Sequence, residues 1–183
     1  AARYSYRHTE LFDERFTDAE KPLIDRVFPQ VRISKFSVSA ILDTRDDVID
    51  PDTGVFVIVD SELAARGVGS EVGFTKTFLQ GFGFYRVPTA RRTVLAVGAR
   101  LGAAHGFRRL VVLEGPDGEP ILAPGGGSIV HEVQDLPAGE RFFAGGDTTV
   151  RGFSLDRLGT DATISPTGFP TGGNGLIVLN AEL

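Results

Sequence analysis

The chain has 183 residues, of which 42% are hydrophobic and 23% charged, a composition that suits one domain with a sizeable core. Its net charge of −5 argues against a general nucleic-acid-binding protein, which needs a basic surface to neutralise phosphates. The absence of cysteine excludes disulfide scaffolds, thiol catalysis and cysteine-ligated zinc. No run approaches the ~20 apolar residues of a membrane-spanning helix, but alternating transmembrane β-strands escape that test.

Two features of the ends predict that the chain is part of a longer protein. It contains no methionine, and no signal peptide precedes Ala1. It also stops at Leu183, within a run of alternating apolar residues. We therefore expect an internal segment.

Period-two alternation of apolar and polar residues recurs along the chain and predicts six long strands. Helical periodicity is confined to one short turn at 19–28. Most of the runs are near the ~9–11 residues that a tilted strand needs to cross a bilayer, and longer than the ~5–6 typical of soluble strands. The strands are expected at residues 2–12, 31–43, 55–65, 71–86, 93–105 and 175–183.

The alternation also predicts which face of each strand meets lipid. Segment 71–85 does not fit, because phenylalanines share one face with Lys76 and Gln80. A β-bulge would change the phase of part of that strand and explain the mixture. Elsewhere the lipid-facing set should be Val57, Val59, Val97, Leu101, Ile177 and Leu179, and the lumen-facing set Arg100, Asn180 and Glu182.

The connections between the expected strands alternate in length. Compact turns at 43–54 and 87–92 should lie on one side, and segments 13–30, 66–70 and the very long 106–175 on the other. Short periplasmic turns and longer outer loops are typical of outer-membrane barrels. This pattern alone leaves a soluble β-sandwich with long strands open.

The 106–175 segment is far longer than the median loop of ~4–6 residues, so it either is disordered or has a function. Its middle predicts a small hairpin, in which 110–113 and 120–122 flank the turn signal GPDG. Its most informative string is ERFFAGGDTTVRGF, residues 140–153. The tip of that string combines a cation, a glycine that permits a sharp turn and two apolar anchors.

Signals for a metal ion or an enzyme active site are weak. Five aspartates lie within 43–52, but they lack the ligand spacing of an EF-hand, which favours an Asp-rich turn over a calcium site. The three histidines have no metal-binding spacing, and no GxSxG motif supports a serine hydrolase. We therefore predict no catalytic residue, no metal and no cofactor, and a protein that is not an enzyme.

Three strings, in this order, carry a resemblance to one family: DTRDDVIDPDTG at 43–54, RFFAGGDTTVRGF at 141–153 and GGNGLIVLNAEL at 172–183. They resemble signatures of the BamA/TamA-like outer-membrane assembly barrels, the bacterial surface antigen family. The resemblance implies an all-β, antiparallel, up-and-down transmembrane β-barrel. Residues 1–183 would supply about six strands of it, with the long loop at 106–175. The remaining strands and the periplasmic POTRA domains would lie outside this chain.

In that family the tip of the long loop folds back into the barrel, and its arginine pairs there with a carboxylate. By position, Arg151 matches the arginine and Glu182 the carboxylate. The alternation independently puts Glu182 on the polar face, where a buried charge needs a partner. The other motif residues carried over are Val150, Gly152, Phe153, Gly145 and Gly146.

The resemblance implies insertion and assembly of β-barrel proteins into the bacterial outer membrane, without covalent chemistry. Implied partners are outer-membrane lipids, nascent β-barrel proteins and periplasmic accessory subunits, and no nucleic acid. In the family, the first and last strands part and an incoming strand adds to the exposed edge. Two alternatives stay open: a two-partner secretion pore of the same superfamily, and the barrel anchor of a surface enzyme.

Overall fold

The computed structural model describes residues 1–8, 31–89, 93–113, 119–134, 136–147, 149–166 and 168–183. These residues form antiparallel β-strands and two short 3-10 turns, η1 (Arg66–Val68) and η2 (Ala138–Glu140). None of the helical turns described is long and apolar enough to span a membrane. The prediction of an all-β, antiparallel fold is confirmed.

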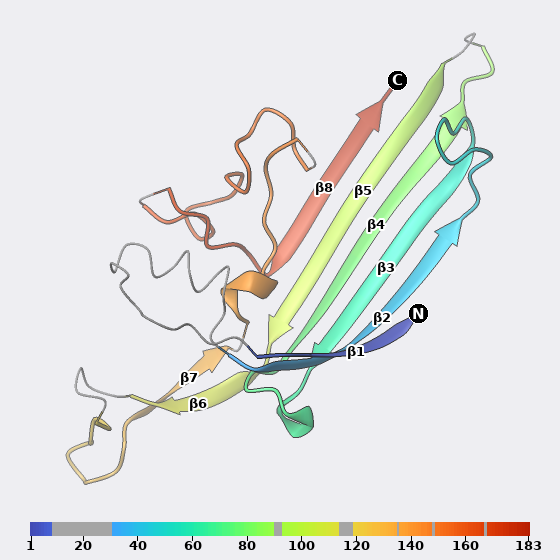
Figure 1. Cartoon of the computed structure of the whole chain (residues 1–183). Helices are drawn as coiled ribbons and strands as arrows, with labels where there is room; N and C mark the ends of the chain where they lie inside the picture. Colours follow the sequence, from blue (N-terminus) through green and yellow to red (C-terminus); the bar gives the residue numbers. More distant parts are fainter. Residues whose placement is uncertain (9–30, 90–92, 114–118, 135, 148, 167) are drawn as a thin grey trace.

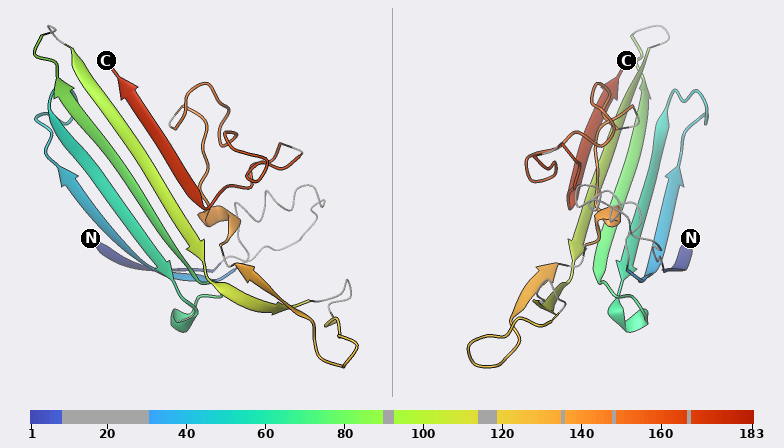
Figure 2. Two further views of the ribbon diagram at one scale, coloured as in Figure 1. Left: turned by 180° about the vertical axis from the view of Figure 1, so that it is seen from behind. Right: turned by 60° about the vertical axis from the view of Figure 1, so that its left-hand side comes forward.

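Six long strands form one sheet in which each strand pairs with the next, in the order β1-β2-β3-β4-β5-β8 (Figure 1). They make a single curved layer with β1 and β8 at its two edges, not two sheets packed face to face (Figure 2). This arrangement rules out the β-sandwich alternative. The strands are β1 (Ala2–Arg7), β2 (Ile33–Asp43), β3 (Gly54–Ala64), β4 (Phe74–Arg86), β5 (Val94–Gly106) and β8 (Gly175–Glu182).

The strand boundaries follow the alternation closely in β2, β3, β5 and β8. For the predicted strand 2–12, β1 ends at Arg7; residues 9–12 and the predicted helical turn at 19–28 lie outside the described residues. β4 starts later than predicted, because the Glu71 backbone N–H donates to the Arg32 carbonyl at 2.9 Å and holds that segment outside the ladder. The turns 44–53 and 87–93 lie at one end of the sheet as expected, and the other end carries the similarly short connection 65–73 and the long segment between β5 and β8.

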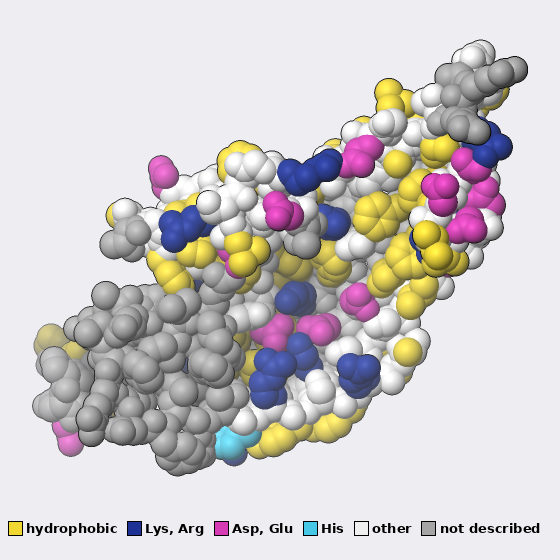
Figure 3. All heavy atoms as spheres, turned by 45° about the horizontal axis from the view of Figure 1, so that its top comes forward, with side chains coloured by type: hydrophobic (Ala, Val, Ile, Leu, Met, Phe, Trp, Pro, Cys, Tyr) yellow, Lys and Arg dark blue, Asp and Glu magenta, His cyan; other side chains and the backbone are white. Residues whose placement is uncertain are grey.

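The two faces of the sheet differ in chemistry. We call the face against which residues 136–174 lie the inner face, and the opposite one the outer face (Figure 2). On the outer face Ile177 and Leu179 are 77% and 72% exposed, and the Tyr4 and Phe36 rings lie 5.1 Å apart. The inner face is hollowed and holds basic and acidic side chains side by side (Figure 3).

The strand pairing places the residues predicted to face lipid and those predicted to face the lumen on opposite faces of the sheet. Leu179 lies opposite Ala99 and Ile177 opposite Leu101 on the outer face, whereas Asn180 lies opposite Gly98 on the inner face. Arg100 and Glu182 line the inner hollow with Asn180. Val57, Val59 and Val97 occupy outer positions of β3 and β5.

β4 contains no β-bulge, so that part of the sequence interpretation is wrong. Its pairing with β3 and with β5 runs without interruption. Its inner face is genuinely mixed: Phe78 lies there between Lys76 and Gln80. The aromatic ring is tolerated because the Phe142 ring of the long loop stacks on it, with centroids 6.2 Å apart and planes at 28°.

A small buried core lies at the loop end of the sheet. Phe74 and Ala64 are completely buried there, and Ile33 and Val72 pack beside them. Leu136, which enters from the long loop just before η2, completes the cluster. The sheet and the base of the loop therefore share one core.

The sequence predicts that 110–113 pairs with 120–122, but in the structure the main partner of this segment is a later one. β6 (Arg108–Val112) pairs with β7 (Val130–Gln134) in a separate two-stranded sheet that projects from the loop end (Figure 1). The chain reverses at 123–127, where the Ala123 N–H donates to the Gly127 carbonyl at 2.7 Å. The Ile121 N–H donates to the Leu113 carbonyl at 2.8 Å, and the Ile121 carbonyl accepts from the Ile129 N–H at 2.8 Å. The predicted turn GPDG lies outside the described residues.

Adjacent residues of β8 give a matched test of the two faces. Leu179→Lys puts a charge on the outer face near the middle of the paired strands, and should destabilise the full-length protein in bilayers by about 2–4 kcal/mol. Asn180→Lys puts the same charge in the inner hollow and should cost less than about 1 kcal/mol. Urea unfolding in liposomes measures both, and equal losses would contradict the assignment of faces.

Candidate functional site: the inward loop and the opposite turn

Residues 136–174, here called the inward loop, fold back over the inner face of β4, β5 and β8 (Figures 1 and 2). The two arms of the loop are joined by backbone pairing. Phe142 and Gly173 exchange two hydrogen bonds of 2.9 Å, and the Leu158 N–H donates to the Ala144 carbonyl at 2.9 Å. The loop is thus a folded unit with its own hydrogen bonds.

The base of the inward loop is fixed to the sheet by a buried carboxylate. Glu140 is only 8% exposed, and its oxygens accept hydrogen bonds from Lys35 of β2 at 3.1 Å and Lys76 of β4 at 3.4 Å. Lys35 also donates to Glu62 at 2.9 Å. Buried charges are stable only when paired in this way, so the four residues act as one balanced network.

An aromatic contact adjoins this network. The Phe142 ring stacks on Phe78 and lies 5.2 Å below the Lys76 ammonium. Across the sheet it fills the space above Gly102, where an added Cβ would come within 2.7 Å of the ring. Gly102 is therefore needed for the close approach of the loop to β5.

Arg141, between these two wall contacts, holds the arms of the loop to each other. Its Nε donates to the Leu136 carbonyl at 3.3 Å and its Nη1 to the Thr171 carbonyl at 3.2 Å. Alternate residues therefore serve different purposes: 140 and 142 contact the sheet, and 141 contacts the loop.

Gly145 and Gly146 begin the turn that leads to the tip. Gly145 has φ +112°, and a Cβ there would lie 2.4 Å from the Ser154 carbonyl oxygen, so no other residue fits. The Thr149 hydroxyl closes the turn by accepting from the Gly145 N–H at 2.9 Å and donating to its carbonyl at 2.7 Å. The Gly146 N–H donates to the Phe153 carbonyl at 3.0 Å.

The tip reaches β8. The Arg151 guanidinium donates to the Glu182 carboxylate, although both side chains are well exposed, at 75% and 60%. Gly152 has φ +90°, the sharp turn that the sequence predicts. Val150 lines the inner hollow, whereas the Phe153 side chain is half exposed.

The structure brings Arg151 and Glu182 together, and their role in function stays a prediction. The sequence reasoning gave no role to Glu140, Phe142 or their lysine partners. One signal was available: Lys76 and Gln80 stand among phenylalanines on one face of the strand. Such a mixture indicates a second layer of chain over that face, which the loop supplies.

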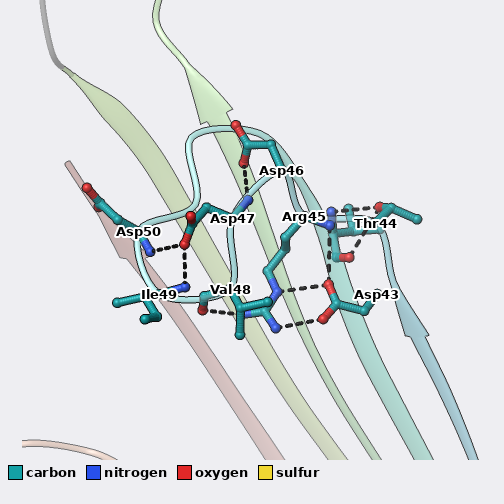
Figure 4. Close-up of polar contacts among 9 residues, drawn as sticks. Asp43, Thr44, Arg45, Asp46, Asp47, Val48, Ile49 and Asp50 are labelled. Carbon is teal, nitrogen blue, oxygen red and sulfur yellow. Dashed lines mark hydrogen bonds and ion pairs between the residues drawn. The ribbon is translucent and has the colours of Figure 1, made fainter.

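The turn at 43–54, at the other end of the sheet, is the second motif of the resemblance. Arg45 makes two hydrogen bonds to the Asp43 carboxylate and donates to the Val48 carbonyl at 3.1 Å (Figure 4). One Asp46 oxygen accepts the N–H groups of Asp47, Asp52 and Thr53 at 3.0–3.1 Å. One Asp47 oxygen accepts those of Ile49 and Asp50, at 2.7 and 3.0 Å.

These backbone donors stabilise the charged carboxylates of the turn. The Thr53 N–H is the main group that lowers the pKa of Asp46, and the Asp50 N–H is the main group that lowers the pKa of Asp47. No group of three or more acidic or histidine side chains in the described ranges is arranged to hold a metal ion. The Asp46 and Asp47 carboxylates order the turn by accepting hydrogen bonds from its backbone.

Comparison with known proteins agrees with this architecture. Residues 1–183 match the family model described as the Omp85 superfamily domain. Over 118 residues the chain is 28% identical to a SAM50-like protein of Schizosaccharomyces pombe. The aligned region covers 64% of this chain and 20% of that relative, so the chain spans about a fifth of its length.

The turn should be stable to acid over a defined range. Because the folded pKa values of Asp46 and Asp47 are lowered, their contribution is fully present above the unfolded aspartate pKa of ~3.9 and is lost as pH falls through the folded values. The hydrogen-exchange protection factors of the Thr53 and Asp50 amides, measured relative to their intrinsic rates, should therefore fall only below pH ~4. Asp46→Ala should accelerate exchange at Thr53 even at neutral pH, and the control Asp50→Ala should not.

The tip pair should show coupling in a double-mutant cycle. Arg151→Ala and Glu182→Ala should be non-additive by up to about 1 kcal/mol, a small value because both side chains are exposed. A control cycle combines Glu182→Ala with Arg108→Ala, which breaks the exposed ion pair with Glu132 on the β6–β7 hairpin. That cycle should be additive. Simple additivity at the tip would show that the contact contributes nothing to stability.

Proposed function

Because the chain belongs to the Omp85 superfamily, we propose that it is part of a barrel that inserts and assembles β-barrel proteins into an outer membrane. The observation that carries the proposal is the folded inward loop, whose Arg151 reaches Glu182 on the barrel wall. Both ionic and aromatic contacts pack this loop against the inner face.

In this proposal the described strands form the stable wall. β2, β3, β4 and β5 are hydrogen-bonded on both sides, so none of them offers a free edge to an incoming strand. Lipid cannot satisfy backbone N–H and C=O groups. A folding substrate strand therefore needs an unpaired strand edge elsewhere in the barrel, with which its own backbone groups can pair. The inward loop braces the wall while that edge opens.

We propose that the barrel lies in the bacterial outer membrane, on the similarity of the three motifs to the bacterial assembly barrels. Residues 1–183 would be a partial barrel domain, completed by further strands and periplasmic POTRA domains of a longer protein. The exposed Ile177 and Leu179 side chains suit contact with lipid. The other proposed partners are nascent β-barrel proteins and periplasmic accessory subunits. The process needs no cofactor and no covalent chemistry.

Reconstitution tests the proposal. The full-length protein in liposomes should accelerate folding of a urea-unfolded test barrel, measured as the appearance of the protease-resistant form. Arg151→Ala should slow this assisted folding about fivefold, which corresponds to the ~1 kcal/mol upper range of an exposed ion pair. Arg108→Ala, which breaks a similarly exposed ion pair outside the inner hollow, should leave the rate unchanged.

Two results would count against assembly. An unmodified protein that gives no acceleration but transports one unfolded polypeptide would be a secretion pore. Equal rates for Arg151→Ala and the unmodified protein would separate the inward loop from the assembly function.

A further inference from the structure

Glu140 lies at the end of η2, where the inward loop meets β2 and β4. Its two carboxylate oxygens are divided between two strands: Oε1 accepts from Lys35 at 3.1 Å and Oε2 from Lys76 at 3.4 Å. All three side chains are largely buried, with exposures of 8%, 15% and 21%. A carboxylate held by two strands is fixed both along and across the sheet.

The wall needs this carboxylate for charge balance. Lys35 pairs with Glu62 on the neighbouring strand at 2.9 Å. Lys76 lies opposite Glu62 in the strand register, but its ion pair is with Glu140. Two lysines and one glutamate of the sheet therefore leave one excess positive charge, and the loop supplies the matching negative one. Removing one member of such a buried network leaves another charge without a partner.

Phe142 reinforces the same attachment. Its ring lies below the Lys76 ammonium and on Phe78, so two loop residues contact the same lysine of β4. Arg141 ties this stretch to the Leu136 and Thr171 carbonyls. The base of the loop is therefore fixed to the wall and to the returning arm.

The tip contact differs, because Arg151 and Glu182 are both mostly exposed. An exposed pair contributes too little to place a long loop by itself. We propose that Glu140 is the positioning residue of the inward loop: held by Lys35 and Lys76, it sets the base and thereby brings Arg151 within reach of Glu182. This inference rests on the proposed function in one respect: it takes the contact between Arg151 and Glu182 to be functional.

Cross-linking reads the position of the tip without any assembly assay. Residues 1–183 contain no cysteine, so Arg151→Cys and Glu182→Cys provide a unique pair within them. In the full-length protein, with any other cysteine changed to serine, a short bis-thiosulfonate reagent spans the length of the removed side chains. Because this background lacks the tip ion pair, the yield depends on the base. Glu140→Gln should lower the initial cross-linking rate by at least about fivefold, as expected for loss of a buried partner.

A matched control and a second variant complete the design. Glu132→Gln removes a glutamate that pairs with Arg108 on the β6–β7 hairpin, and should leave the rate unchanged. Lys35→Gln leaves Glu140 paired with Lys76 and should lower the initial cross-linking rate by a smaller factor. Folding of each variant is judged by gel mobility without heating. If Glu140→Gln does not fold, the result for Lys35→Gln tests the proposal. Unchanged cross-linking in a folded Glu140→Gln protein, or in Lys35→Gln when Glu140→Gln does not fold, overturns the proposal. Normal assembly by a Glu140→Gln protein that retains Arg151 and Glu182, together with reduced cross-linking, would instead contradict the role of the tip in the proposed function.

Discussion

The pairing of Glu140 with two lysines is the contact on which the arrangement of the inner face depends. An unpaired charge in this half-enclosed hollow would cost several kcal/mol, so the lysines of β2 and β4 and the carboxylate of the loop are stable only together. β3 lies between the two lysine-bearing strands, so the network spans three neighbouring strands. The position of η2, and with it the start of the loop, follows from where those lysines stand.

The two faces of the sheet obey different packing rules. On the outer face, apolar side chains contact one another across neighbouring strands, as the Tyr4 and Phe36 rings do. On the inner face, rings fit over positions without side chains: Phe142 lies over Gly102, and Phe82 lies 3.1 Å from where a Cβ of Gly98 would be. Gly98 and Gly102 of β5 therefore make room for aromatic rings. At Gly102 this allows the inward loop to approach the sheet closely.

The sequence predicted the strands best where each face meets one kind of surroundings. The boundaries of β2 and β8 agree closely with the structure, and alternation placed Leu179 and Asn180 on the correct faces, although Val178 is an apolar inner residue buried at 6% exposure. The β-bulge in β4 was wrong because alternation assumes that a polar face meets water, whereas Phe78 meets Phe142. The GPDG signal itself lies outside the described residues; what local turn chemistry could not specify is that the principal partner of β6 begins only after the glycines at 125–127.

The candidate site was predictable to a similar extent. Glu182 could be placed on the inner face by alternation, but its pairing with Arg151 came only from the resemblance to known motifs. Glu140 was out of reach, because its partners lie 105 and 64 positions away and its own surroundings give no periodic signal. Contacts across such separations depend on how the loop folds, which no local pattern specifies.

The β6–β7 hairpin has a consequence for how new chain could be added to this protein. It forms a sheet of its own, and the link to β5 is held by the Phe107 N–H, which donates to the Gly73 carbonyl at 2.7 Å. Extending the far end of the hairpin leaves that hydrogen bond and the six-stranded sheet untouched. Doubling a flexible connection costs only about 0.6 kcal/mol of closure entropy, so this arm is a natural place to graft an epitope or a small display domain.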